Sequence, residues 1–237
     1  MATPLPPSIF NDVVGPVMRG PSSSHSAASV RIGRLARDLC GGGPDRVLVE
    51  FDTLGSLATT HDSQGSDMGL CGGLLGWPAD DERLPQSAAA LEAAGIDLEI
   101  RVAELSDPHP NTYRLSLWRQ DVRHDMIALS TGGGMIEVIA IDGMPVSLFG
   151  DYDVTLLEVD GDGSSVCSKL EGSADEVHVT GQDPAMVVIN AQAFMDEQHL
   201  AGLQGIKRIR HLGAVLPVRS RKGLYVPFLH ASEMVAR

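Results

Sequence analysis

The sequence predicts a mixed α/β (α+β) fold, with a larger first unit and a smaller second one. Apolar residues repeat at helical spacing over residues 28–39, whereas apolar and polar residues alternate as in a half-buried strand over residues 96–102. The charge then reverses within the last third of the chain. Residues 151–183 hold nine carboxylates against one lysine, and residues 207–222 hold six Lys or Arg and no acid. We therefore expect a boundary near residue 150.

The first predicted helix follows the segment Gly20-Pro21-Ser22-Ser23-Ser24-His25. Its buried face is predicted from apolar residues at positions i, i+4, i+7, i+8 and i+11, namely Ala28, Ile32, Leu35, Ala36 and Leu39. The three serines therefore lie at the start of this helix. The run Gly41-Gly42-Gly43 is expected to end it, because glycine tolerates the left-handed conformation of a helix cap.

Two further helices and two strands are expected next. The pattern predicts a strand over 47–54, a helix over 67–75 that follows Ser66, a helix over 85–94 and a strand over 96–102. The helix over 67–75 contains Gly69, Gly72 and Gly73, and glycine lowers helix propensity. Glycines are expected there only if another backbone packs very close, so this helix should be buried.

Strands are expected to dominate up to the boundary. Tyr113, Leu115 and Leu117 alternate with polar residues, and the runs 135–141 and 146–149 flank Asp142-Gly143, a strong hairpin signal. Beyond the boundary, the pattern predicts strand, helix, strand, strand, helix and strand over 155–159, 166–170, 176–180, 185–190, 196–203 and 206–212. This βαββαβ order is typical of a small ferredoxin-like module.

Composition excludes several classes of protein. The 237 residues are 43% hydrophobic, and 31 acidic against 18 basic residues give a formal charge of -13. Because phosphate backbones and anionic membranes are bound by clustered Lys and Arg, no nucleic acid and no membrane is expected as a partner. Cys40, Cys71 and Cys167 fit neither a metal-ligand spacing nor a disulfide framework, and the N-terminus has no signal segment. We therefore expect a cytoplasmic protein with no metal site of its own.

The segment Ser22-Ser23-Ser24-His25 carries the strongest chemical signal. At a helix N-terminus, free backbone N–H groups, the helix dipole and three hydroxyls can hold a carboxylate or a phosphate. His25 has an ordinary pKa of about 6.5, so it can take a proton from a bound substrate near neutral pH. The alternative is that the serines only cap the helix and that His25 is a solvated first-turn residue. Spacing alone favours that alternative.

Three other segments carry weaker signals. Residues 59–67 form a polar loop between a strand and an apolar helix, where open α/β proteins often bind ligands, although an ordinary cap at Ser66 explains the loop too. The segment His109-Pro110-Asn111-Thr112 offers an imidazole and an amide, but a simple turn needs the same residues. Gly132-Gly133-Gly134 allows a close backbone approach and does not match a dinucleotide fingerprint.

Five motifs occur in order over about two thirds of the chain: GPVMRGPSSSHSAASVRIGRLAR at 15–37, QGSDMGLCGGLLGW at 64–77, DDERL at 80–84, HPNT at 109–112 and TGGGMIEVI at 131–139. Together they resemble the β chain or β domain of iron–sulfur-dependent L-serine dehydratases, also called L-serine ammonia-lyases. The resemblance implies the β-domain fold of that family, which is similar to allosteric substrate-binding domains.

The resemblance also implies a reaction and a partner. In the family, a 4Fe–4S cluster held by three cysteines of the α part binds the substrate hydroxyl while a base removes the α-proton, and the product hydrolyses to a 2-oxo acid and ammonia. The cysteines of this chain do not suit such a cluster, so a separate cluster-bearing α subunit is implied, and a higher oligomer stays open. The family pattern places His25 as the base or its close partner. The surrounding substrate-binding residues are expected to be Ser22, Ser23, Ser24, Asp67, His109, Asn111 and Thr112.

One loop departs from the family pattern. Where the family commonly has Lys-Gly-His before Gly-Thr-Asp, this chain has Asp62-Ser63-Gln64 before Gly65-Ser66-Asp67, and Ser26 stands where the family has Thr. A cation and an imidazole are thus replaced by a carboxylate and a neutral amide, which should weaken recognition of an anionic group or alter proton transfer. The substrate is therefore expected to be L-serine or another β-hydroxy or β-substituted amino acid.

The end of the chain carries weaker resemblances. Residues 154–212 are similar to a degenerate ACT domain, and residues 223–237 are similar to the junction between the β and α domains of single-chain members. We accordingly divide the chain into 1–150, 151–215 and 216–237. A non-enzymatic interpretation stays open, because the β domain also resembles the allosteric substrate-binding domain of some D-3-phosphoglycerate dehydrogenases. The chain would then be a non-catalytic amino-acid-binding or regulatory module.

Overall fold

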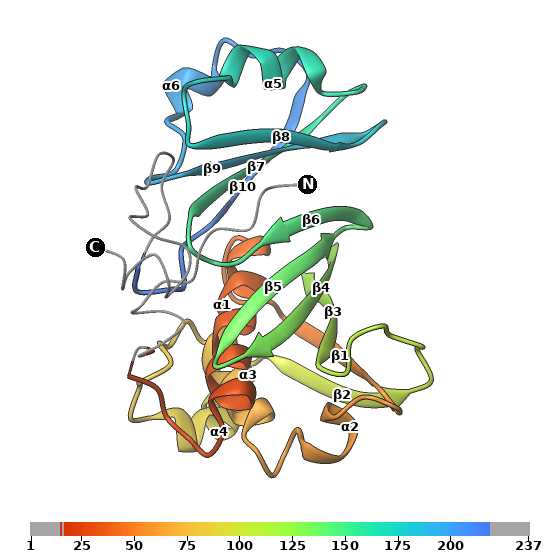
Figure 1. The fold of residues 1–237 in the computed structure, drawn as a ribbon, viewed down its shortest axis with the longest axis vertical. Helices are drawn as coiled ribbons and strands as arrows, with labels where there is room; N and C mark the ends of the chain where they lie inside the picture. The colour runs from red at the N-terminus through yellow and green to blue at the C-terminus, as the bar shows by residue number, and fades with distance from the viewer. Residues whose placement is uncertain (1–14, 16, 219–237) are drawn as a thin grey trace, which may run out of the picture.

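The computed structural model describes residue 15 and residues 17–218, and the predicted junction segment therefore lies almost wholly outside the described residues. Two sheets are stacked, with the smaller one above the larger one in Figure 1. The predicted α+β fold class is confirmed. Within the described ranges, no helix is long and apolar enough to cross a bilayer.

The first unit is a six-stranded sheet with helices packed on one face. Its elements are the π-helical turn η2 (Ser23–Ala27), α1 (Ala28–Leu39), β1 (Arg46–Asp52), α2 (Leu57–Thr60), α3 (Ser66–Leu74), the 3-10 turn η3 (Leu84–Gln86), α4 (Ser87–Ala93), β2 (Asp97–Ala103), β3 (Thr112–Arg119), β4 (Val122–Gly132), β5 (Met135–Ile141) and β6 (Met144–Leu148). The strand order is β2-β1-β3-β4-β5-β6. Only the pair β1–β2 is parallel, and the other pairs of this sheet are antiparallel.

Helices α1 and α3 pack with their backbones almost in contact, as the glycines of α3 predicted. A Cβ atom on Gly69 would lie 2.1 Å from Ser29 Oγ, and one on Gly73 would lie 2.2 Å from the carbonyl oxygen of Val30. Side chains at these positions would force the helices apart, because protein interiors are close-packed. This contact fixes the start of α3 beside the start of α1, which is where the candidate site lies.

The second unit has the predicted succession of six elements. They are β7 (Asp153–Val159), α5 (Ser164–Leu170), β8 (Glu176–Gly181), β9 (Ala185–Ala191), α6 (Glu197–Leu200) and β10 (Ile206–Leu212). The sheet is antiparallel with the order β10-β7-β9-β8, and α5 and α6 cover its outer face in Figure 1. This order of strands and helices is that of a ferredoxin-like module.

The two units share buried apolar surface. Leu157 and Val159 of β7 belong to a cluster beneath α5 and α6, whereas Val154 and Leu156 belong to the core of the first unit. Because successive strand residues point to opposite faces, β7 is buried on both sides. The second sheet is therefore packed between its own helices and the larger unit.

Several sequence-based expectations need correction. Strand β4 was not predicted as an element, because its buried face carries the polar residues His124 and Ser130 among apolar ones. Helix α6 has four residues rather than the eight expected. The first strand ends at Asp52 rather than residue 54, because the Asp52 carboxylate accepts hydrogen bonds from the backbone of Leu54 and Asp107 and turns the chain. Ser66 is not a cap: it is the first residue of α3.

Candidate active site

The candidate site lies where the start of α1 meets α2, the start of α3, the 109–111 loop and the end of β4. The backbone N–H groups of His25 and Ser26 both donate to the Ser22 carbonyl, at 3.1 and 2.7 Å, and form the wide turn η2 ahead of α1. Ser22 occupies the cap position, yet its hydroxyl makes no cap hydrogen bond to the backbone. The interpretation that Ser22 merely caps the helix is therefore wrong.

Both ring nitrogens of His25 are hydrogen-bonded. Nδ1 lies 3.0 Å from Ser22 Oγ, and Nε2 lies 3.1 Å from Thr60 Oγ1. The Thr60 hydroxyl donates its one hydrogen to the carbonyl oxygen of Ser56 at 2.6 Å, so it can only accept from His25. His25 is therefore the Nε2–H tautomer, and its Nδ1 accepts from Ser22. This half-buried residue is not the solvated one of the alternative interpretation.

The environment keeps His25 neutral. Burial lowers its pKa below the ordinary value of 6.5, because the charged form loses hydration. A neutral imidazole at pH 7 can accept a proton, so the group is in the protonation state that a general base requires.

A ring of hydrogen bonds, closed by the peptide link from Ser24 to His25, joins His25 to distant segments. Its first part is the path from His25 through Thr60 to Ser56. Ser56 Oγ donates to Asn111 Oδ1, and Asn111 Nδ2 donates to the carbonyl oxygen of Ser130 at 3.5 Å. Ser130 Oγ in turn donates to the carbonyl oxygen of Ser24 at 2.6 Å, next to His25. The structure thus brings the predicted residues Ser24, His25 and Asn111 together.

The other residues of the 109–112 segment hold its turn. His109 Nδ1 accepts from the backbone N–H of Asn111 at 3.1 Å, and the buried Thr112 hydroxyl donates to the His109 carbonyl at 2.7 Å. Thr112 is 4% exposed, so its expected contact with a substrate is not supported by this geometry. Ser22 and Ser24 lie near each other, with their Oγ atoms 3.2 Å apart.

A second imidazole beside the ring was not among the predicted site residues. His61 follows Thr60 directly, and its Nδ1 lies 2.8 Å from both carboxylate oxygens of Asp67 at the start of α3. Its ring also packs against Phe51, with ring centroids 5.3 Å apart. A carboxylate at Nδ1 fixes the Nδ1–H tautomer and leaves Nε2 as an acceptor.

Asp67 is therefore committed to His61 rather than directed at a substrate as expected. Burial raises the pKa of Asp67, and the hydrogen bond from His61 acts in the opposite direction. The signal in the sequence was a histidine in the polar loop six residues before the aspartate. Their pairing depends on the way the loop folds back, with the backbone N–H of Ser66 donating to the His61 carbonyl at 2.8 Å.

No family model matches the chain. The chain is 41% identical over 150 residues to the probable L-serine dehydratase beta chain of Bacillus subtilis (strain 168), which covers 63% of this chain and 67% of that protein. It is 34% identical over 167 residues to the L-serine dehydratase beta chain of Peptoniphilus asaccharolyticus, covering 68% of this chain and 74% of the relative. The chain belongs to the L-serine dehydratase beta-chain family. The resemblance predicted from the five motifs is confirmed.

An iron–sulfur cofactor is suggested for the L-serine dehydratase family, and the cysteines of this beta chain do not fit one. Burial raises the pKa of Cys40 to about 11 and that of Cys71 to about 12, so burial disfavours the thiolate form of both. Cys167 belongs to α5 in the second unit. Among the residues that the structure describes, no three His, Cys, Asp or Glu side chains gather as a metal would require.

Proposed function

We propose that this chain is the β subunit of a two-chain iron–sulfur-dependent amino acid dehydratase. The reaction eliminates water from L-serine or a related β-hydroxy or β-substituted amino acid and yields a 2-oxo acid and ammonia. The observation that carries the proposal is a neutral His25, fixed in one tautomer by a hydrogen-bonded ring, in a beta chain of this family. Because the cysteines here do not fit a cluster, the cluster belongs to a separate α subunit.

In this proposal His25 holds the proton that leaves the substrate α-carbon. Its acceptor atom is Nδ1, which faces the Ser22 hydroxyl at 3.0 Å. The proton reaches Nδ1 either when that hydroxyl rotates away or through the hydroxyl itself. The imidazolium formed keeps its Nε2–H bond to Thr60, so the ring holds its orientation in both protonation states.

The pair His61–Asp67 is the second proton-transfer group of the proposed site. Asp67 orients His61 as the carboxylate of a catalytic triad orients its histidine, and Nε2 is left to accept a proton. His61 is also three residues before Gln64, the position where the family commonly has an imidazole. We propose that His61 supplies the imidazole that this loop otherwise lacks.

Substrate recognition is proposed for the serines ahead of α1. Their hydroxyls and the helix N-terminus suit the carboxylate of an amino acid. Asp62 and Ser63 are exposed at the loop beside the site, where the family commonly carries a cation. A carboxylate at this position repels negative charge, so it disfavours a substrate that carries a second negative charge.

The test is anaerobic co-expression with a candidate α chain, followed by copurification, a cluster spectrum and ammonia release from a panel of amino acids. We expect a complex whose absorbance shows a cluster and which releases ammonia from L-serine or another β-hydroxy amino acid. Failure of the two chains to associate would contradict the proposal.

A second candidate is a non-catalytic amino-acid-binding or regulatory module. It is favoured by the altered loop, where exposed Asp62 and the neutral Gln64 replace a cation and an imidazole. This candidate predicts that the isolated chain binds an amino acid while the reconstituted pair releases no ammonia from any member of the panel.

A further inference from the structure

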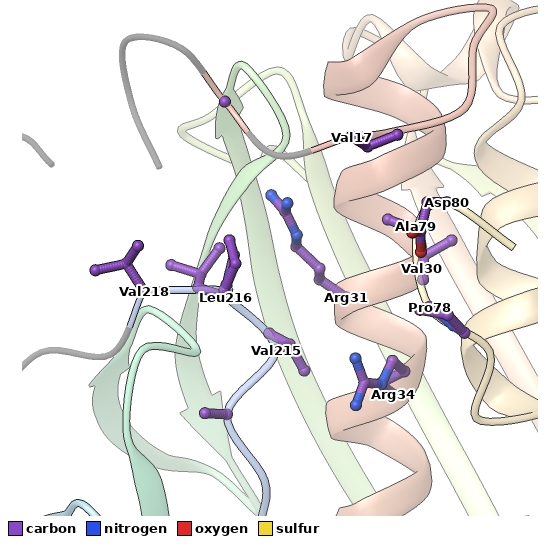
Figure 2. Close-up of a pocket in the computed structure, with 13 residues that line it drawn as sticks. Val17, Val30, Arg31, Arg34, Pro78, Ala79, Asp80, Val215, Leu216 and Val218 are labelled. Atoms are coloured by element: carbon purple, nitrogen blue, oxygen red, sulfur yellow. The ribbon is translucent and has the colours of Figure 1, made fainter. Parts of the chain in front are cut away.

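A cavity of about 590 Å³ lies apart from the candidate site, between α1, the 78–80 segment and the 214–218 segment that follows β10. Figure 2 shows Arg31 and Arg34 leaving α1 toward Val215 and Leu216. No residue of the hydrogen-bonded ring around His25 lines this cavity. The cavity therefore presents chemistry that the proposed dehydratase reaction does not use.

Arg31 is a buried cation without a counter-charge in the described part of the chain. It is 2% exposed, its Nη1 donates to the Gly134 carbonyl, and its Nη2 lies 3.8 Å from Met18 Sδ. Its Nε is buried and has no hydrogen-bond partner among the described residues. Burial, together with the charge of Arg34, lowers the pKa of Arg31 to about 10. A buried charge is costly unless it is paired, so this arginine calls for an anion.

Arg34 adds a second positive charge to the same cavity. It lies three residues after Arg31 on α1, so both side chains project from neighbouring turns of one helix face. Within residues 17–218, neither arginine has a carboxylate oxygen within 4.0 Å. Asp38 lies one turn further along α1; burial raises its pKa, and the charge of Arg34 acts in the opposite direction. Asp80 also lines the cavity, from the exposed 78–80 segment.

The rest of the wall is largely apolar. Val30 of α1 and the buried Val215 and Leu216 contribute branched side chains beside the two arginines. The 215–216 segment is held in place because both of its backbone N–H groups donate to the Gly150 carbonyl, at 2.8 and 2.9 Å. The wall opposite the cations is therefore fixed and suits a short hydrocarbon chain.

We propose that this cavity binds a small aliphatic carboxylate, with the carboxylate on the half-buried Arg34 beside the buried charge of Arg31 and the hydrocarbon part against Val215 and Leu216. This inference goes beyond the proposed function and does not depend on it. Arg31 donates to Gly134 at the turn between β4 and β5, and β4 also carries Ser130 of the hydrogen-bonded ring. The ligand would thus contact Arg31, which links this cavity through Gly134 and β4 to the edge of the candidate site.

The test is calorimetric titration of the full chain, without any α subunit and at low ionic strength, because salt screens ion pairs. Sodium propionate is compared with propionamide, which has nearly the same shape and no charge. We expect propionate to bind with one-to-one stoichiometry and propionamide to bind at least about tenfold more weakly, as a charge-assisted hydrogen bond is lost.

Variants make the assignment specific. Arg34→Gln removes a half-buried cation of the cavity, and we expect it to weaken propionate binding about tenfold or more. Arg101→Gln, on the exposed edge strand β2 and outside the cavity lining, is the matched control and should bind as the unmodified chain does. The proposal is overturned if propionate does not bind, if propionamide binds equally well, or if Arg34→Gln binds as tightly as Arg101→Gln.

Discussion

The tautomer of His25 follows from the one proton of the Thr60 hydroxyl. Because that proton goes to the Ser56 carbonyl, His25 must carry its own proton on Nε2 and accept at Nδ1. The serine beside Nδ1 is then a donor rather than a helix cap. At the scale of single residues, the hydrogen-bonding roles in the site thus depend on which acceptor receives each hydroxyl proton.

The first prediction concerns the pKa of His25. Burial lowers it below 6.5, so NMR titration of the His25 ring in the folded chain should give a midpoint below that value. The unfolded chain then binds this proton more readily than the folded chain does. The resulting stability is complete above pH 6.5 and is lost as the pH falls through the folded pKa.

The control for this prediction is His25→Gln. Its free energy of unfolding should decrease less between pH 7.5 and pH 5.5 than that of the unmodified chain. A titration midpoint at or above 6.5 in the folded protein would show that burial does not determine the protonation of His25.

The second prediction concerns the orientation of His61 by Asp67. Asp67→Asn keeps a similar shape but offers an amide where Nδ1–H needs a carboxylate, so turnover of the reconstituted pair should fall by about tenfold or more. Asp121→Asn changes an exposed carboxylate in the β3–β4 turn, outside the candidate site, and should leave turnover unchanged. Equal turnover of the two variants would exclude His61 from proton transfer.

The sequence predicted some residues of the site and not others. His25 and Asn111 could be proposed because their motifs occur in the family's order. The His61–Asp67 pair could not, since it depends on the fold of a loop that departs from the family pattern. The bond from Ser130 to Ser24 spans 106 residues, and no local pattern predicts such a contact.

At the scale of elements, the α1–α3 contact determines where the parts of the site meet. The glycines of α3 were informative because glycine lowers the helix propensity of a segment, so its presence inside a helix indicates a packing requirement. Strand β4 was missed because His124 and Ser130 face inward and are satisfied by distant partners, Asp142 and Ser24. Local alternation predicts a strand only when its buried face is apolar.

The third prediction tests that helix contact. Gly73→Ala would place a Cβ 2.2 Å from the Val30 carbonyl oxygen, so the free energy of unfolding should fall by about 1–3 kcal/mol. Gly202→Ala is the matched control, because nothing lies within 4 Å of its Cβ position and its backbone is not left-handed. Chemical denaturation measures both, and a Gly73 variant as stable as the Gly202 variant would contradict the contact.

At the scale of the whole molecule, one ion network joins the two sheets. Arg210 of β10 donates to Asp142 at 2.8 Å and to Glu158 at 3.1 Å. Asp142 lies in the β5–β6 turn and also accepts from His124 at 3.0 Å. Burial opposes its ionisation, but the bonds from His124 and the Asp125 backbone and the charge of Arg210 lower its pKa. Asp142-Gly143 was predicted only as a hairpin turn, and its link to Arg210 was not foreseen.

The fourth prediction follows from this network. Arg210→Met leaves Asp142 and Glu158 without their cation, and the free energy of unfolding should fall by about 3–5 kcal/mol. Arg208→Met removes an exposed cation from the same strand and should change it by no more than about 0.5 kcal/mol. Similar values for both variants would mean that the network does not hold the two units together.

The central claim is that this chain contributes proton-transfer residues to a dehydratase completed by an α subunit. Its most direct test is ammonia release by the reconstituted pair, with His25→Ala compared with the unmodified chain at equal association by size-exclusion chromatography. We predict that the variant associates normally and loses about 10²-fold or more in turnover, because a general base is removed. Near-normal turnover by the His25→Ala pair would contradict the claim.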